Sequence, residues 1–175
     1  MPRHVVCRIH AVASSSGETS PSRSSVDARR GLFDDLVRSE TRIYNALGER
    51  LRAEHGIVTS QFELLRYLGA HPDARVADMA TVFAAGIGAV SKGVDRLEAR
   101  GWAARVPNPA DRRSSLVRLT GSGAALVAAA ERTFDAELER LIASTLSDEQ
   151  VDAVASALGA VRRALEEARI GLPVG

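Results

Sequence analysis

Hydrophobic residues recur at helical spacing along most of the chain, and no proline occurs from Ser22 to His71 or from Ala110 to Leu172. Long helices are therefore possible in both segments. The first apolar stripe lies near one face of a helix and consists of Leu32, Leu36, Ile43, Leu47 and Leu51. It predicts a helix from about Val26 to Glu54, with Gly56 just past its end, where glycine is common.

The middle of the chain predicts three short helices. Residues 60–63 (Ser-Gln-Phe-Glu) fit a capping box, so a helix is expected to begin there. A second helix spans about Val76 to Phe83, and an Ala84-Ala85-Gly86 turn follows it. The third helix ends at Arg100-Gly101 and carries on one face Ile87, Val90, Val94 and Leu97.

The pattern then changes to β structure. Residues 102–106 and 115–119 are short β-compatible runs, and the residues between them include two prolines and an Asn-Pro step. Such a loop predicts a β-hairpin. Thr120 is placed to cap a fifth helix that reaches about Leu146.

Residues 147–150 (Ser-Asp-Glu-Gln) form a second capping box and predict a sixth helix. Its apolar positions recur at intervals of 3, 4, 3 and 4: Val151, Val154, Leu158, Val161 and Leu165. Such a seam packs either inside one chain or against a partner helix, and its regularity favours the partner.

Composition limits the class of protein. Apolar residues make up 45% and charged residues 26%, and no apolar run approaches the ~18 residues of a membrane-spanning helix. Residues 1–25 hold seven serines and one acidic residue and predict a disordered tail. The single cysteine, Cys7, excludes an intrachain disulfide, and its neighbours His4 and His10 are interpreted as incidental.

The net charge of +1 conceals an uneven distribution. Residues 86–118 carry seven basic and three acidic side chains, whereas residues 119–175 carry five basic and nine acidic ones. An excess of four could arise by chance among 45 charges. The basic segment nevertheless favours a surface that faces phosphates.

The order helix, tight turn, helix, hairpin is that of a winged helix-turn-helix, whose second helix enters the major groove of DNA. With its apolar face packed inward, that helix presents to DNA Gly88, Ser91, Lys92, Asp95 and Arg96. Further candidate DNA contacts are Ser60 and Gln61, at the start of the first of the three short helices. Gly93 lies within the second helix at a cost of roughly 1 kcal/mol relative to alanine.

Two stretches, VSKGVDRLEARGW (90–102) and NPADRRSSLVRLT (108–120), resemble the MarR family of bacterial transcriptional regulators. The resemblance implies that Arg113 enters the minor groove, that Asp111 orients it by a charge-assisted hydrogen bond, and that Arg112 lies near the DNA backbone. The alternative is that Asp111 and Arg113 only close the hairpin. Gly86 replaces the common Ser or Thr cap, and Gly93 replaces a bulky apolar residue.

The resemblance implies a mainly α fold with a small β-hairpin wing. Its predicted organisation is a tail (1–25) and a MarR-type domain (26–170), in which 57–120 form the winged helix-turn-helix and 26–55 and 121–170 the helical dimerisation region. A homodimer on a pseudo-palindromic operator, acting as a repressor in the bacterial cytoplasm, is the function that it implies.

Many MarR relatives release DNA when a small, often aromatic or phenolic, ligand binds. Here the corresponding region holds Tyr44, Arg66, Tyr67 and His71, which ordinary packing would explain equally well. No cofactor or metal is expected, because His55 and His71 do not form a ligand cluster and the first helix lacks the cysteine of oxidant sensors.

Two other classes of function were weighed. An enzyme is disfavoured because the chain has no phosphate-binding glycine loop, no HExxH and no nucleophile elbow. A winged helix used only for protein–protein contact is the alternative. The basic residues of the wing and the second helix favour double-stranded DNA over that alternative.

Overall fold

The computed structural model describes residues 25–111 and 113–173, so the tail with Cys7, His4 and His10, and also Arg112, lie outside the described residues. The chain divides into two compact units, residues 1–38 and 39–175, and each is considered by itself. No described helix is long and apolar enough to cross a membrane.

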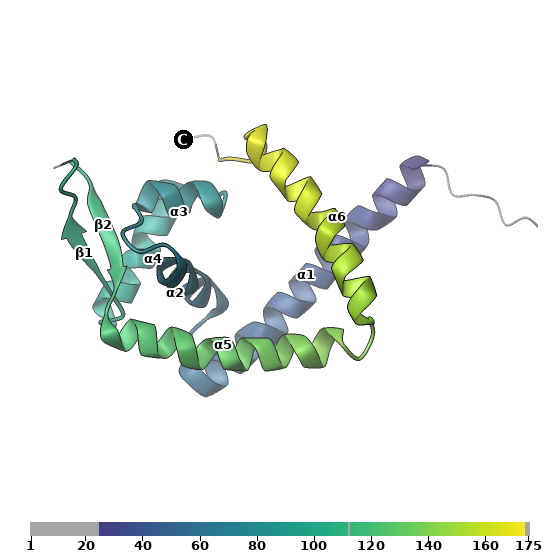
Figure 1. Cartoon of the computed structure of the whole chain (residues 1–175), viewed down its shortest axis with the longest axis horizontal. Coiled ribbons are helices and arrows are strands. Elements are labelled where there is room, and N and C mark those ends of the chain that lie inside the picture. The colour runs from purple at the N-terminus through teal and green to yellow at the C-terminus, as the bar shows by residue number, and fades with distance from the viewer. Residues whose placement is uncertain (1–24, 112, 174–175) are drawn as a thin grey trace, which may run out of the picture. The chain divides into compact units, whose positions relative to one another are not determined.

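The elements follow the predicted order (Figure 1). The helices are α1 (Ser25–His55), α2 (Thr59–Ala70), α3 (Val76–Val82), α4 (Ile87–Ala99), α5 (Gly121–Ile142) and α6 (Asp148–Glu167). Strands β1 (Ala103–Pro107) and β2 (Ser115–Leu119) pair antiparallel, with Arg105 opposite Val117. The mainly α fold with a hairpin wing is thus confirmed.

Hydrogen bonds at the predicted caps explain where two helices begin. The Thr120 hydroxyl accepts a hydrogen bond from the Gly123 amide at 3.1 Å, and Ser147 and Gln150 cap α6 reciprocally. Helix α5 ends at Ile142, before the predicted Leu146, because the amides of Thr145 and Leu146 both turn back to the Ile142 carbonyl.

The predicted capping box at residues 60–63 is wrong by two positions. Helix α2 begins at Thr59, and its cap residue is the extended Val58. Gln61, at the third helical position, closes this end by accepting the Val58 amide on its side-chain oxygen at 3.1 Å. Because Gln61 already serves as the reciprocal partner, Ser60 lies exposed on the first turn, and Glu63 bonds Tyr44 instead.

Three helices end in the same left-handed turn, the Schellman motif. At the end of α4, Gly101 has φ +71°, and the Trp102 amide donates to the Leu97 carbonyl at 3.0 Å. Ala84 after α3 and Arg169 after α6 take the same conformation without glycine, at φ +46° and +54°. The sequence predicted the end at Gly101 and the turn at Ala84, but not the positive φ of Ala84 or Arg169, because alanine and arginine carry no signal for it.

The main core lies between α2, α3, α4 and the hairpin. Its fully buried members include Leu65, Met79, Val94, Leu97 and Val117. The Val117 amide also donates to the Ala74 carbonyl at 2.8 Å, so a short third segment pairs with β2. A second cluster, made of Leu51, Ile57, Phe62 and Ala130, joins the end of α1 to α2 and α5.

Helix α4 buries Val90, Val94 and Leu97, as predicted, but the prediction that Ile87 packs inward is wrong. Ile87 is 61% exposed because it opens the helix, one turn before the part that lies over the core. Gly93 is explained by packing, since a Cβ there would lie 2.7 Å from the Leu64 Cδ1 atom of α2.

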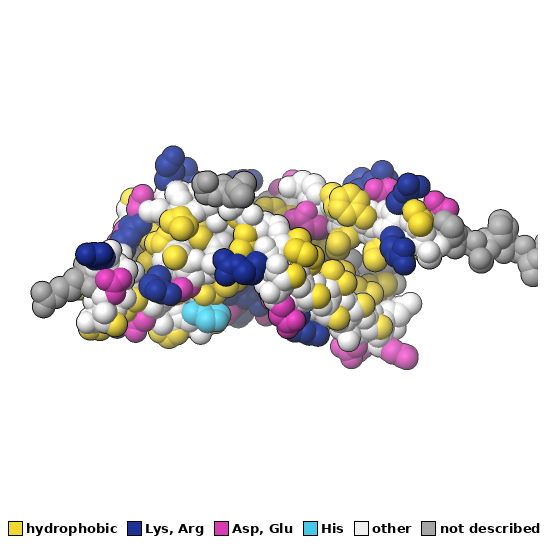
Figure 2. Space-filling model, turned by 90° about the horizontal axis from the view of Figure 1, so that it is seen from above, with side chains coloured by type: hydrophobic (Ala, Val, Ile, Leu, Met, Phe, Trp, Pro, Cys, Tyr) yellow, Lys and Arg dark blue, Asp and Glu magenta, His cyan; other side chains and the backbone are white. Residues whose placement is uncertain are grey.

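The apolar seam of α6 is not covered by the described chain. Val154, Val161 and Leu165 are 48%, 55% and 42% exposed, and no residue of α6 is buried. Figure 2 shows hydrophobic side chains lying open between charged ones on this side of the molecule. Val151 and Leu158 of the seam are partly buried, so the seam contributes no fully buried residue to the core of the described chain.

The start of α5 presses against the turn before β1. A Cβ on Gly123 would lie 1.9 Å from the Trp102 carbonyl oxygen, which also accepts the Thr120 amide at 3.1 Å. We expect Gly123→Ala to lower the free energy of unfolding by about 2–3 kcal/mol, because relieving this clash displaces bonded backbone.

The matched control is Gly121→Ala, since a Cβ at Gly121 meets nothing within 4 Å. That variant should gain roughly 0.4–1 kcal/mol by restricting the unfolded chain. Urea unfolding followed by helical circular dichroism measures both. Equal stability of the two variants would contradict the close contact.

Candidate nucleic-acid interface

Helix α4 presents three different surfaces once its apolar face is buried. Lys92 lies exposed on the face opposite the core. Ser91 and Asp95 face the hairpin, because both contact Arg105 of β1. Arg96 lies on the other side, where it lines a cavity of about 340 Å³ together with Ser60 and Glu63 of α2. The predicted DNA-facing residues therefore do not share one uniform face.

Arg105 clamps the hairpin to α4. Its guanidinium lies 2.7 Å from an Asp95 carboxylate oxygen, pairs also with Glu98, and donates to the Ser91 hydroxyl at 3.3 Å. Its backbone amide donates to the other Glu98 oxygen at 2.7 Å. Asp95 and Glu98 are one turn apart, so a single strand residue satisfies both. Sequence reasoning missed this role of Arg105 and Glu98, and the only signal for it was two acidic residues in a basic segment.

A second ion pair holds the base of the wing. Arg118 of β2 pairs with Asp73, and this hydrogen bond holds the pKa of the Asp73 carboxyl below its ordinary value. Asp73 has φ +69°, a conformation that aspartate adopts more readily than most residues. The neighbouring Ala74 bonds β2, so the pair lies beside a backbone contact.

The start of α3 is fixed by Arg75 and Asp78. One Asp78 carboxylate oxygen accepts the Arg75 backbone amide at 3.0 Å, and the other accepts the Arg75 guanidinium at 2.7 Å. The hydrogen bond to Arg75 lowers the pKa of Asp78. Arg75 is thereby neutralised locally, although it lies at the entrance to the helix-turn-helix.

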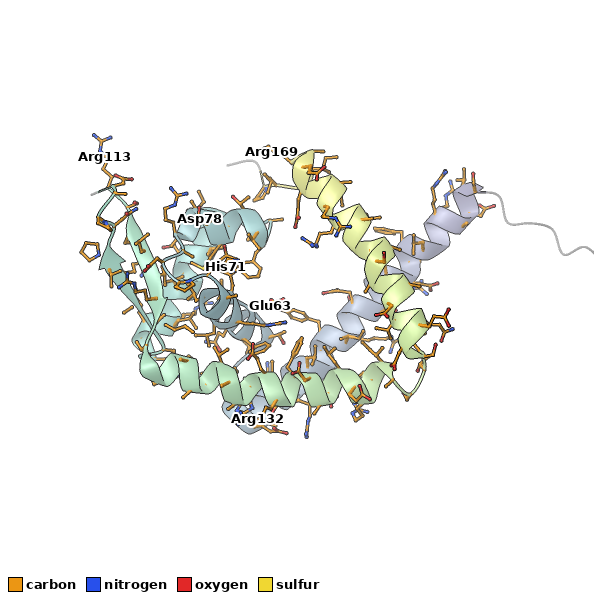
Figure 3. All side chains as sticks on the ribbon, viewed as in Figure 1. Glu63, His71, Asp78, Arg113, Arg132 and Arg169 are labelled. Atoms are coloured by element: carbon orange, nitrogen blue, oxygen red, sulfur yellow. The ribbon has the colours of Figure 1, made fainter. Side chains whose placement is uncertain are left out.

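The wing loop is shaped by side chains that bond the backbone. Asn108 accepts the Ala110 amide at 3.0 Å and donates to the Ser114 hydroxyl at 2.8 Å. Asp111 accepts the Arg113 backbone amide at 3.0 Å. The predicted bond from Asp111 to the Arg113 guanidinium is not formed, because the carboxylate is engaged by the backbone of the turn. The Arg113 side chain is exposed and projects from the tip of the hairpin (Figure 3).

Pairing reduces the basic segment to a few available cations. Arg105 and Arg118 are engaged by acidic groups, and the Arg100 guanidinium stacks 4.6 Å from the centre of the Trp102 ring. Within residues 25–111 and 113–173, Lys92, Arg96 and Arg113 have no acidic partner within ion-pair distance. These three come from the second helix of the helix-turn-helix and from the tip of the wing.

The four predicted ligand contacts do not surround one cavity. Tyr44 donates to Glu63 at 3.3 Å, and Arg66 lies 5.3 Å from the Phe134 ring centre. Tyr67 and His71 stack on each other with ring centres 4.2 Å apart, and the His71 ring bonds the Tyr67 carbonyl. A cavity of about 270 Å³ beside Tyr44 is lined also by Asn45 and Arg52.

Burial raises the pKa of both the Tyr44 hydroxyl and the Glu63 carboxyl. For Glu63 the hydrogen bond from Tyr44 opposes this effect, but burial is the larger cause. Among the described residues no three His, Cys, Asp or Glu side chains are grouped so as to hold a metal ion.

A sequence model of the MarR family matches residues 57–115, which run from just before α2 to the first residue of β2. Over 126 residues the chain is 28% identical to the multiple antibiotic resistance protein MarR of Escherichia coli K12, covering 69% of this chain and 88% of that protein. The middle of the chain, residues 57–115, thus matches the MarR family, and the chain is similar in sequence to a MarR protein.

Solved structures of MarR proteins agree with this assignment. A mutant of E. coli MarR complexed with operator DNA has a TM-score of 0.70 at 25% identity and covers 78% of this chain and 97% of that chain. The transcriptional repressor CouR, bound to a 23-mer DNA duplex, has a TM-score of 0.67 at 27% identity and covers 73% and 89%.

The MarR family regulator Sco3205 of Streptomyces coelicolor, also solved with DNA, has a TM-score of 0.76 at 20% identity and covers 88% and 98%. At that identity the likeness shows the fold alone. The MarR relatives are regulators of transcription and not enzymes.

The clamp formed by Arg105 predicts a stability effect. Arg105 and Glu98 are only 26% and 30% exposed, so Arg105→Ala leaves two neighbouring carboxylates without their cation. We expect a loss of about 1–3 kcal/mol in the free energy of unfolding, the usual range for a hydrogen-bonded charged group. The free energy of unfolding of Arg105→Lys should lie between those of Arg105→Ala and the unsubstituted protein, because an ammonium keeps the charge but cannot reproduce the planar fork of the guanidinium.

Lys92→Ala serves as the matched control, because Lys92 is an exposed cation on the same helix. Its unfolding free energy should stay within about 0.5 kcal/mol of the unsubstituted protein. Thermal and urea unfolding give the comparison. The clamp would be refuted by an Arg105→Ala protein as stable as the Lys92→Ala control.

Proposed function

We propose that this protein is a sequence-specific, DNA-binding regulator of transcription that acts as a homodimeric repressor on a pseudo-palindromic operator. The observation that carries the proposal is that Lys92, Arg96 and Arg113 remain available for phosphates, whereas Arg100, Arg105 and Arg118 are engaged internally. The 25%-identical MarR solved with operator DNA supports the same function.

In this proposal α4 enters the major groove. Lys92 contacts phosphate or a base edge from the exposed face, and Arg96 reaches the backbone on the α2 side, where Ser60 lies beside it. Gly86 supplies no side-chain cap, and Gly88 has nothing within 4 Å of its Cβ position, so the first turn of α4 can approach DNA closely.

Four predicted contacts receive a more specific role. Ser91 and Asp95 act through Arg105 and hold the hairpin at a fixed distance from α4, so we propose them as positioning residues. Gln61 has its side-chain oxygen on the Val58 amide, which leaves its NH2 group for a phosphate. Asp111 shapes the turn that carries Arg113.

The wing is proposed to read the minor groove. Arg113 stands at the hairpin tip with an exposed guanidinium, the group that narrow minor grooves attract electrostatically. Arg112, outside the described residues, is proposed as a backbone contact. Because the loop bonds do not involve the Arg113 guanidinium, its insertion into the groove would not disturb the hairpin.

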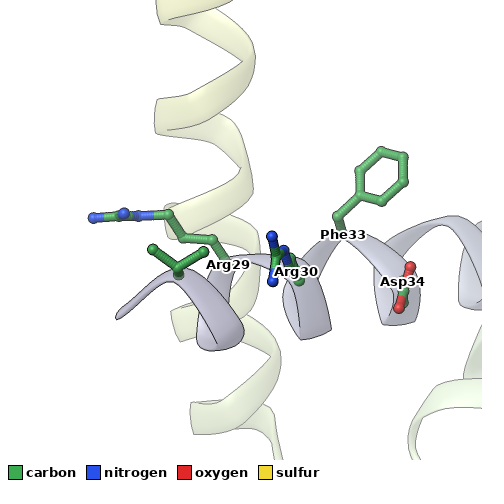
Figure 4. Close-up of a pocket in the computed structure, with 5 residues that line it drawn as sticks. Arg29, Arg30, Phe33 and Asp34 are labelled. Atoms are coloured by element: carbon green, nitrogen blue, oxygen red, sulfur yellow. The ribbon is translucent and has the colours of Figure 1, made fainter. Parts of the chain in front are cut away.

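Dimerisation is supported by two apolar surfaces, each taken by itself. The seam of α6 leaves Val154, Val161 and Leu165 open. In the other unit, α1 exposes Leu32, Phe33 and Leu36, and Phe33 lines a surface hollow of about 460 Å³ with Arg29 and Arg30 (Figure 4). We propose that a second copy of the chain covers both surfaces, which would explain the regular seam.

We further propose that the protein responds to a small aromatic or phenolic effector. The cavity beside Tyr44, with Arg52 and Asn45, offers a cation and amide groups to such a ligand. Arg66, Tyr67 and His71 are engaged in other contacts and would have to rearrange to join it. The bacterial cytoplasm, where operator DNA lies, is the proposed place of action.

Binding to duplex DNA should depend steeply on salt. If about six phosphates are contacted, affinity should fall on the order of 10³-fold between 50 and 200 mM salt. Fluorescence anisotropy on the promoter beside the protein's own gene measures this, and titration should end at two chains per duplex site. Salt-independent binding, or no binding to any duplex, would count against the function.

Substitution of the wing arginine should weaken binding selectively. Arg113→Ala is expected to cost ~1–3 kcal/mol of binding free energy, because it removes the groove contact. The matched control is Arg132→Ala on α5, whose exposed guanidinium bonds the Ala128 carbonyl and stands away from the hairpin (Figure 3). Equal affinity of the two variants would remove the assignment of Arg113 to the groove.

A further inference from the structure

The chain turns back sharply after α6. The Ile170 amide donates to the Leu165 carbonyl at 2.9 Å, and the Arg169 amide donates to the Glu166 backbone carbonyl at 3.0 Å. Together these two bonds form a complete Schellman motif. Arg169 has φ +54°, and Gly171 has φ +82° two residues later. Two left-handed residues so close together reverse the chain direction and fix where the following residues point.

The returning segment meets the helix-turn-helix. Leu172 and Pro173, with Arg169, form one wall of a groove of about 560 Å³. The opposite wall consists of Ala77 and Thr81 of α3 and of Ile87 and Gly88 at the start of α4. The C-terminal end of the ribbon lies near α3 in Figure 1, in agreement with this shared groove.

The groove is apolar, and one side chain of the segment is partly sheltered. The Thr81 hydroxyl turns back to the Ala77 carbonyl at 3.1 Å, so it presents little polarity to the groove. Leu172 is half-buried, whereas Ile170 is 62% exposed and is not part of the wall. Leu172 is therefore the partly buried side chain that the segment presents to the groove it shares with the helix-turn-helix.

We propose that residues 169–173 are an autoinhibitory arm that docks on α3 and on the first turn of α4. This inference rests on the proposed function, because Ile87 and Gly88 belong to the end of α4 that would approach DNA. With the arm docked, a duplex cannot reach that turn without displacing Leu172. The arm thus competes with DNA, and its release is a step in operator binding.

The competition predicts that removing the arm tightens binding. A chain that stops after Ala168 and a Leu172→Asp variant should each bind the same duplex about fivefold more tightly, which corresponds to freeing one partly buried leucine. Ile170→Asp adds the same charge outside the groove and is the matched control, expected to stay within about twofold of the full chain. Thermal unfolding checks that all four proteins are folded.

A second measurement needs no DNA. In nuclear magnetic resonance spectra of the dimer, removal of the arm should shift the amide signals of Ala77, Thr81 and Gly88, and Ile170→Asp should not. Unchanged signals, or equal DNA affinity of folded full-length and truncated chains, would overturn the arm. Absence of DNA binding by every chain would instead overturn the proposed function, while the spectra still decide the arm.

Discussion

The guanidinium of Arg105 is the interaction on which the proposed interface depends, because it is the group that joins the wing to α4 through side chains. It forms ion pairs with both Asp95 and Glu98 and donates a hydrogen bond to the Ser91 hydroxyl. The backbone amide of the same residue is held by Glu98. A hairpin tethered in this way cannot tilt independently of α4. Together with the shared apolar core and the Arg118–Asp73 pair, this clamp holds the hairpin against α4 before any DNA is present.

This clamp also determines which charges of the basic segment are paired inside the protein. Asp95 and Glu98 reduce the formal excess of the basic segment, yet both are paired with Arg105, and Asp73, outside that segment, is paired with Arg118. The paired charges cancel within the protein, and the unpaired cations face outward. A nearly neutral chain can thus present a concentrated positive surface, which permits attraction to phosphates without nonspecific binding of anions over the whole molecule.

Much of the fold could be predicted because its signals are local. The apolar spacing of α4, the caps Thr120 and Ser147 and the prolines around the wing each act within a few residues. The errors arose where a different partner engages the group than the pattern suggests, or where the edge of the core decides. Gln61 displaced the expected cap of α2, Ile87 lies beyond the edge of the core, and Asp111 bonds a backbone amide instead of a guanidinium. The pairing of Arg105 with α4 joins residues on different elements, so no spacing rule could reveal it.

The loop at the tip of the wing holds its shape through Asn108, Asp111 and Ser114, none of which needs a particular side chain at position 113. Shape and recognition are therefore carried by different residues. Under the proposed function, a change at the tip would alter what is read in the groove and leave the hairpin folded. Such a regulator could acquire a new operator preference by single substitutions, each tested by selection without first passing through a misfolded intermediate.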